Sequence, residues 1–207
     1  MTLTDVGILI FDGVEVLDFC GPFEVFSLAS KPGDADRYPD NALFKVHTVA
    51  ENAAPIKTVG GMEVVPSCTI ADHPPFAILV VPGGFGTRAI YREKPDVLDW
   101  IARQAERGVI TTSVCTGASL LAKAGLLRGK RATTHWASID RLRELHQEIT
   151  VLDDLRIVDE GAVVTSAGVS AGIDMALHIV ARLHGAEAAV KTARDMEYRW
   201  EPGEWSS

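Results

Sequence analysis

The residue best suited to covalent chemistry is Cys115, which stands where a strand-like segment passes into a helix-like one. Residues 109–114 are apolar or β-branched for the most part, and Thr116 and Gly117 follow the cysteine directly. A thiol on such a turn lies above the sheet, over the amino end of the next helix, whose N–H groups and dipole favour an anion. We therefore expect Cys115 to be a nucleophile with a lowered pKa. The competing interpretation is a small buried residue with no chemical role.

A second strand end carries consecutive glycines that fit the same site. Segment 80–86 reads Val-Val-Pro-Gly-Gly-Phe-Gly, and the carboxyl ends of parallel strands gather at one edge of a sheet, where ligands bind. The backbone N–H of Thr116, together with that of Gly83 or Gly84, is predicted to hold a developing negative charge.

The other two cysteines, Cys20 and Cys68, are expected to be structural, although Cys20 could line the same pocket. Cys20 precedes Pro22 in a predicted turn, and Cys68 lies in a predicted loop. Three cysteines at wide, irregular spacing suit neither a disulfide framework nor a zinc site. We expect a reduced, cytoplasmic protein without a bound metal.

Short apolar runs alternate with helical patterns along the chain, which is typical of an α/β fold. Strands are predicted at 6–11, 44–50, 78–82, 109–114, 155–158 and 162–166, with a small hairpin at 56–65. Helices are predicted at 22–29, 95–107, 117–124, 173–183 and 186–194. Continuous apolar strands separated by helices favour one mostly parallel sheet covered by helices on both faces. No linker or repeat interrupts the pattern, so a single domain over 1–207 is expected.

Composition and motifs disfavour several functions. The chain has 207 residues and a formal net charge of −8, whereas a nucleic-acid surface depends on clustered Lys and Arg. No run reaches the roughly 18 apolar residues that cross a bilayer, and the first residues lack the basic region of a signal peptide. No phosphate-binding or dinucleotide motif is found, so no cofactor is expected. A loop rich in Gly, Pro and Asp is predicted at 31–39.

Four segments resemble the signature segments of the DJ-1/PfpI superfamily, which is related to the class I glutamine amidotransferases. They are 81–84 (Val-Pro-Gly-Gly), 113–117 (Ser-Val-Cys-Thr-Gly), 130–136 (Lys-Arg-Ala-Thr-Thr-His-Trp) and 165–174 (Thr-Ser-Ala-Gly-Val-Ser-Ala-Gly-Ile-Asp). The resemblance covers nearly the whole chain and is closest to the isonitrile hydratases and to ligand domains of some AraC-type regulators. It implies a flavodoxin-like fold, a cysteine on a nucleophile elbow, and a homodimer.

The resemblance also implies an acid opposite the cysteine, on the segment that follows the first strand. Asp18 occupies the matching position; DJ-1 carries Glu there, whereas the isonitrile hydratases resemble this chain in carrying Asp. A carboxyl beside a thiolate has a raised pKa because of like charge and desolvation, so it can donate a proton near neutral pH. The competing interpretation is that Asp18 caps the helix near Pro22.

Two departures from related enzymes narrow the activity. The PfpI-type proteases carry a His directly after the cysteine, where this chain has Thr116, so peptidase activity is doubtful. The amidotransferases use a His-x-Glu, and the only one here, at 146–148, lies in a charged stretch that we interpret as a solvated helix end. His135 is expected near Cys115 as a supporting or structural residue, and Trp136 in the pocket wall or the core.

The function implied by the resemblance is hydration of an isonitrile to an N-substituted formamide, through a thioimidate on Cys115 with Asp18 as acid. A glyoxalase-like or stress-protective enzyme, and a non-enzymatic ligand or redox sensor, stay open. AraC-type relatives continue into a DNA-binding region, and because this sequence ends at Trp205-Ser-Ser207 we expect no such region here. The expected partner is therefore a small-molecule substrate, with neither nucleic acid nor membrane.

Overall fold

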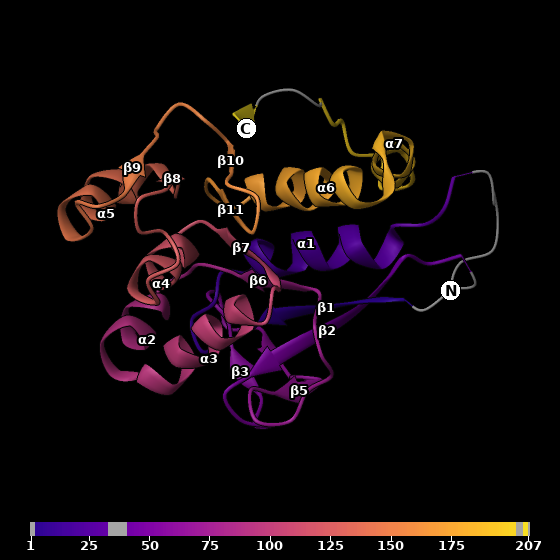
Figure 1. The fold of residues 1–207 in the computed structure, drawn as a ribbon. Coiled ribbons are helices and arrows are strands. Elements are labelled where there is room, and N and C mark those ends of the chain that lie inside the picture. The colour runs from indigo at the N-terminus through magenta and orange to yellow at the C-terminus, as the bar shows by residue number, and fades with distance from the viewer. Residues whose placement is uncertain (1–2, 33–40, 202–204, 207) are drawn as a thin grey trace.

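The computed structural model describes residues 3–32, 41–201 and 205–206. The loop predicted at 31–39 lies outside the described residues from position 33 onward. An eight-stranded sheet forms the centre of the molecule, with helices on both of its faces (Figure 1). This arrangement confirms the expected α/β fold.

The sheet is parallel except at one pair of strands. In spatial order its strands are β12 (Trp205–Ser206), β10 (Ile157–Asp159), β11 (Val163–Ser166), β7 (Ile110–Val114), β6 (Ile78–Val81), β1 (Thr4–Leu9), β2 (Phe44–Ala50) and β5 (Cys68–Thr69). Among the described strands of this sheet, only β10 and β11 pair antiparallel. The strand order reverses between β1 and β6, and in such sheets the crevice at the carboxyl ends of those strands is the usual ligand site.

The helices divide into two layers. One face of the sheet carries α1 (Val16–Leu28), α6 (Ala171–His184) and α7 (Ala186–Asp195), and the other carries α2 (Thr87–Glu93), α3 (Pro95–Glu106) and α4 (Gly117–Lys123). At one end, α5 (Ile139–Leu145) lies beside the short strands β8 (Arg131–Ala132) and β9 (Thr150–Val151). The predicted glycine hairpin is confirmed as β3 (Ile56–Lys57) and β4 (Glu63–Val64).

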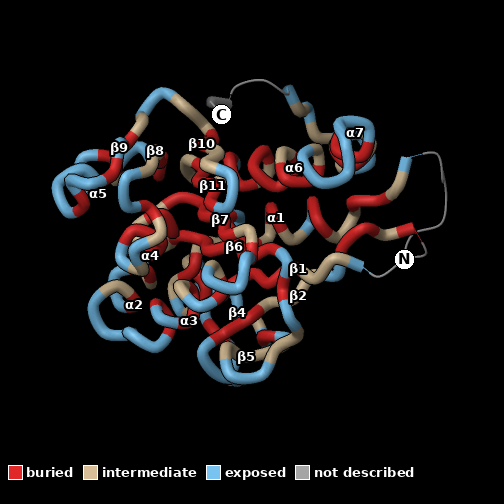
Figure 2. Tube along the Cα trace, viewed as in Figure 1, coloured by how far each residue is buried: buried red, intermediate tan, exposed pale blue. Residues whose placement is uncertain are grey.

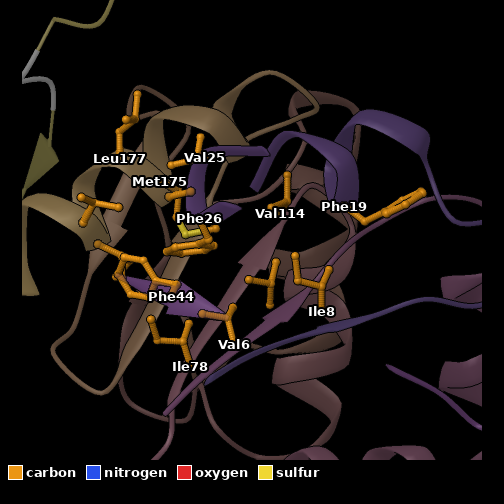
Figure 3. Packing of buried hydrophobic residues seen from close by; sticks show 14 of the residues in the cluster. Val6, Ile8, Phe19, Val25, Phe26, Phe44, Ile78, Val114, Met175 and Leu177 are labelled. Atoms are coloured by element: carbon orange, nitrogen blue, oxygen red, sulfur yellow. The ribbon is translucent and has the colours of Figure 1, made fainter. Parts of the chain in front are cut away.

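Alternate side chains of the central strands build two hydrophobic cores. In β1, Val6 and Ile8 face the core beneath α1 and α6, while Leu9 faces the core beneath the opposite helices. Figure 3 shows Ile8 on its strand below Phe26 of α1 and Met175 of α6. Burial on both faces explains the continuous apolar runs of these strands. Figure 2 shows the same layering, with the central strands buried and much of α2, α5 and α7 exposed.

The first helix differs from the prediction. It begins at Val16, six residues before the predicted start, so Pro22 lies in its interior and Cys20 lies in a helix instead of a turn. An interior proline removes one helical hydrogen bond and normally ends a helix. Here close packing against α6 holds the helix: a Cβ on Gly21 would lie 2.9 Å from Ile173. Asp18 is thereby placed in the first helical turn.

Candidate active site

Cys115 lies on a strained turn between β7 and α4. Its φ is 56°, a left-handed conformation that only a few per cent of non-glycine residues adopt. Hydrogen bonds hold the turn from both sides. The backbone N–H of Cys115 donates to the carbonyls of Ser166 (3.2 Å) and Ala167 (3.0 Å). The carbonyl of Cys115 accepts from the hydroxyl of Thr134 (2.7 Å). Such strain persists only where the surroundings over-determine it. The predicted elbow is present, and Thr134, which the sequence did not single out, secures it.

Glycine at two positions allows three chain segments to meet at this turn. A Cβ on Gly83 would lie 2.6 Å from the backbone nitrogen of Thr116 and 2.8 Å from the carboxyl of Asp18. A Cβ on Gly117 would lie 2.0 Å from the carbonyl oxygen of Val81. The ends of β6 and β7 and the start of α1 therefore converge only because side chains are missing here.

Asp18 is fully buried, with 0% of its surface exposed. Its Oδ2 accepts a hydrogen bond from the N–H of Gly83 at 2.9 Å, while Oδ1 has no partner of regular hydrogen-bond geometry. No Lys, Arg or His in the described part of the chain forms an ion pair with it. A buried carboxyl without a cation is costly to ionise. Its place inside the first turn, with no cap bond, argues against the capping interpretation.

The environment of Asp18 and Cys115 raises the pKa of both groups. Burial raises the pKa of Asp18 to about 7, with a further rise from Glu15, against the lowering effect of the Gly83 hydrogen bond. Burial, followed by the negative charge of Asp18, raises the pKa of Cys115 to about 12, although the N–H and hydroxyl of Thr116 both lower it. The expected lowered thiol pKa is therefore wrong: desolvation outweighs the amino end of α4. The pair as a whole loses its first proton near pH 7 and holds the second.

The backbone amides predicted to stabilise negative charge already have acceptors. The N–H of Gly83 donates to Asp18, and that of Gly84 donates to the hydroxyl of Thr116 at 3.0 Å. The N–H of Thr116 acts on the sulfur of Cys115. All three residues lie at the site, as expected, but their binding of charge on a substrate stays a prediction.

A pocket of about 290 Å³ opens over Cys115. Its wall combines apolar, hydroxyl and charged side chains: Glu15, Gly84, Phe85, Thr87, Arg88, Tyr91, Cys115, Thr116, Ser119, His135, Ala137, Ser138, Arg141, Leu145 and Val169. This volume suits a small organic molecule. Cys20 is not part of the wall.

His135 lines the pocket without bonding to the cysteine. Its Nδ1 accepts a hydrogen bond from the N–H of Ala137 at 3.2 Å, and its ring lies against Gly168, where a Cβ would be 2.2 Å from the ring. His135 therefore lies in the pocket wall with Cys115, and its role as a supporting or a structural residue stays a prediction. Trp136 is 80% exposed and belongs neither to the core nor to this wall.

The His-x-Glu segment lies at a solvated helix end, as expected, except for its histidine. Gln147 and Glu148 are exposed. His146, directly after α5, is only 8% exposed, and its Nε2 lies 3.1 Å from the hydroxyl of Tyr91. Its Nδ1 lies 3.6 Å from Glu148. His146 does not line the pocket, but it contacts Tyr91, which does.

Several wall residues could not be found from the sequence. Arg88 and Arg141 lie on α2 and α5, two helices that the periodicity did not predict. Val169 has φ 51°, an outlier for a β-branched residue, and lies just before α6. A positive φ at valine leaves no mark in sequence, because valine is normally excluded from that conformation.

The described residues show neither a metal-binding cluster nor a membrane-spanning helix. Among them, no group of three or more His, Cys, Asp or Glu side chains is arranged to hold a metal ion. No helix in the described part of the chain is long and apolar enough to cross a membrane.

The fold and this site define an α/β protein with a strained cysteine elbow and a buried carboxyl beside it, opening on a small pocket. The chain belongs to the DJ-1/PfpI family, whose sequence model matches residues 4–182.

Three relatives illustrate the range of the family. The isonitrile hydratase of Pseudomonas putida is 38% identical over 193 residues, which cover 93% of this chain and 78% of that enzyme. The HTH-type transcriptional regulator CdhR of Pseudomonas aeruginosa is 31% identical over 91% of this chain, which spans about half (53%) of the regulator. The crystal structure of a ThiJ/PfpI family protein from Pseudomonas syringae superposes with a TM-score of 0.82 at 30% identity, covering 98% of this chain and 78% of that one. The predicted DJ-1/PfpI fold is confirmed.

Proposed function

We propose that the chain is a cysteine-dependent hydratase that converts an isonitrile to an N-substituted formamide. The observation that carries the proposal is the pair formed by Asp18 and Cys115: a fully buried carboxyl without a counter-ion beside a strained thiol at a pocket. Such a pair can supply a nucleophile and an acid from one shared proton. The 38% identity to an isonitrile hydratase supports this substrate class.

In the proposed reaction, the Cys115 thiol passes its proton to the carboxylate of Asp18 and attacks the terminal carbon of R–N≡C as the resulting thiolate. As the S–C bond forms, the carboxyl proton of Asp18 moves to the same carbon, which gives the thioimidate R–N=CH–S–Cys. Water then adds, its oxygen to the carbon and one proton to the nitrogen. The C–S bond breaks as the remaining hydroxyl proton passes to Asp18, which releases R–NH–CHO and restores the thiolate and the protonated acid.

The neighbouring groups support the two reacting residues. The Gly83 N–H holds one carboxyl oxygen of Asp18, so the other oxygen stays available to carry the proton. The N–H and hydroxyl of Thr116 stabilise negative charge on the sulfur. We assign His135 to the wall, where its ring restricts the space beside the thiol.

Formation of formamide from cyclohexyl isonitrile tests the proposal. Wild type is expected to turn over, Cys115→Ala to lose all activity above the uncatalysed rate, and Asp18→Asn to lose most of it. Cys20→Ala is the matched control, because Cys20 is a free thiol on α1, outside the pocket wall. Equal activity in wild type and Cys115→Ala would exclude the proposed mechanism.

A ligand-binding role without turnover is the second candidate, favoured by the 31% identity to the regulator CdhR. It would use the same pocket, and binding of a small molecule without product would support it. A glyoxalase-like reaction would also keep Cys115 but require a carbonyl substrate. A peroxide sensor would use the same thiol, and oxidation of Cys115 by peroxide without turnover of any isonitrile would support it.

We further propose a cytoplasmic homodimer built from one domain per chain. The family resemblance supports the dimer, and the three cysteines, all free, suit a reducing compartment. Trp136 and Phe85, which are 80% and 72% exposed, offer apolar surface near the pocket mouth. Sedimentation equilibrium tests the dimer; a single species at the monomer mass of 22.3 kDa would contradict it.

A further inference from the structure

Two arginines line the pocket of Cys115, each from a different helix. Arg88 lies in the first turn of α2 and Arg141 lies in α5, and both line the pocket wall. Both are exposed, and within the described residues neither guanidinium forms an ion pair or a hydrogen bond. By contrast Arg143, two residues further along α5, pairs with Asp153 at 3.0 Å.

The charge of this pocket is opposite to that of the chain. The formal net charge is −8, yet the wall holds two guanidinium groups against one carboxylate, Glu15. Glu15 forms no ion pair with either arginine, and its charge acts instead on Asp18. The unpaired guanidinium groups therefore remain free for an anion. Guanidinium groups bind carboxylates with strong, charge-assisted hydrogen bonds.

We propose that the substrate of this site carries a carboxylate, which Arg88 and Arg141 bind while its reacting carbon faces Cys115. This inference rests on the proposed function only for the reacting group of the substrate, which is an isonitrile. A guanidinium group without an ion-pair or hydrogen-bond partner is not enough for this inference, because those of Arg92 and Arg128 also lack one within the described chain. Among the described arginines, only Arg88 and Arg141 both lack such a partner and line the pocket beside the thiol. The apolar wall residues Phe85 and Leu145 would contact the uncharged part of the molecule.

Turnover of a matched pair of isonitriles tests the inference. Isocyanoacetate and its methyl ester differ in charge but little in shape. Wild type is expected to have the higher kcat/KM for the carboxylate, and Arg88→Gln or Arg141→Gln is expected to lower the ratio of the two values by about tenfold, the effect of one charge-assisted hydrogen bond. Arg92→Gln, on α2 but outside the wall, is the control and should leave the ratio unchanged. A ratio that none of these variants changes would overturn the inference while the hydratase stands.

Alkylation of Cys115 provides a readout that needs no turnover. The rates with iodoacetate and iodoacetamide depend on the same thiolate fraction, so their ratio reports only the preference for a negative reagent. We expect this ratio to exceed that of glutathione and to fall toward it in the Arg88→Gln, Arg141→Gln double variant. Peptide mass spectrometry assigns the label, because Cys20 and Cys68 are also free.

The two experiments separate the failure of each proposal. A high alkylation ratio that falls in the double variant, with no hydration of either isonitrile, would support the anion site and reject the hydratase. A ratio equal to that of glutathione in both proteins would reject the anion site whatever the reaction. Circular dichroism of the double variant confirms that the exposed substitutions leave the fold intact.

Discussion

Two aspartates of this protein, the fully buried Asp18 and the half-buried Asp159, are stabilised in opposite ways. Asp159 ends β10, and its carboxylate lies 2.7 Å from His178 and 3.0 Å from Arg182, both on α6. Burial alone would raise its pKa, but the hydrogen bonds from His178 and Gly161 and the charge of Arg182 lower it to about 2. Asp18 has no cation, and burial raises its pKa to about 7.

The difference shows how one residue type serves structure in one place and chemistry in another. A carboxylate beside cations is stable as an anion and connects two elements, here β10 and α6. A carboxyl without cations keeps its proton and can exchange it with a neighbouring thiol near neutral pH. Substitution of each aspartate by asparagine, which preserves shape and removes the charge, tests this contrast directly.

The largest expected effect is on catalysis. Asp18→Asn is expected to lower kcat/KM for cyclohexyl isonitrile by about 10²- to 10⁴-fold, because asparagine cannot donate the proton to the carbon. Asp159→Asn should stay within a few-fold of wild type, since it lies outside the pocket wall. Initial rates of formamide production measure both. Comparable losses in the two variants would break the distinction between them.

The second effect concerns stability at high pH. Native Asp18 keeps its proton up to about pH 7, whereas the unfolded chain releases it near 3.8. The contribution of Asp18 to the free energy of unfolding therefore falls over that interval, by about 4 kcal/mol at about 1.4 kcal/mol per pH unit. Asp18→Asn has no such loss. Urea unfolding at about pH 4 and about pH 8 measures the free energy of unfolding of both proteins. Relative to wild type, the variant should be more stable at about pH 8 than at about pH 4. A difference between the two proteins that does not change with pH would contradict the raised pKa.

The third effect has the opposite sign. The pKa of Asp159 is lowered from 3.8 to about 2, so its ionised form stabilises the native state by about 2 kcal/mol above pH 4. Asp159→Asn is expected to lose this stabilisation at pH 7. The loss should shrink as the pH falls toward about 2, where wild type becomes protonated. The same unfolding experiment measures it, and a variant as stable as wild type at pH 7 would show that the ion pairs contribute nothing.

The smallest effect is the pH dependence of the rate. If attack requires the form of the pair that holds one proton, kcat/KM for a neutral isonitrile should fall about tenfold per pH unit below about 7. The residual activity of Asp18→Asn should not show this fall in kcat/KM below about pH 7, whereas Asp159→Asn should show it as wild type does. A flat wild-type profile from about pH 5 to 8 would assign the proton to another group.

The predicted fold rested on patterns that are local in the chain. The β-branched run before Cys115 and the apolar run before Gly83 became β7 and β6, because strands buried on both faces need continuous apolar residues. Helix α1 was misjudged at Pro22, since its packing against α6 lies far away in sequence. Helix α2 was missed, and only the charged end of α5 was interpreted as helical, because their short, charged segments carry no clear apolar period.

The candidate site could be predicted as a set of residues but not as an environment. Cys115, Thr116, Gly83 and Gly84 follow from strand ends that meet at one edge of a parallel sheet. Asp18 came from family resemblance, and the structure places its carboxyl against Gly83. The thiol pKa was predicted in the wrong direction, because the depth of burial around a turn depends on every segment that covers it.

By itself, the sequence determined the kind of sheet, the turn on which Cys115 lies and the residues that face it. These features follow from the spacing of apolar residues, from glycines and from β-branched residues, which determine the local structure of a few neighbouring positions. Only the tertiary structure decided that Asp18 has no counter-ion and that Arg88 and Arg141 line the same pocket. The physical reason is that desolvation and charge act through space, between segments that the chain separates by many residues.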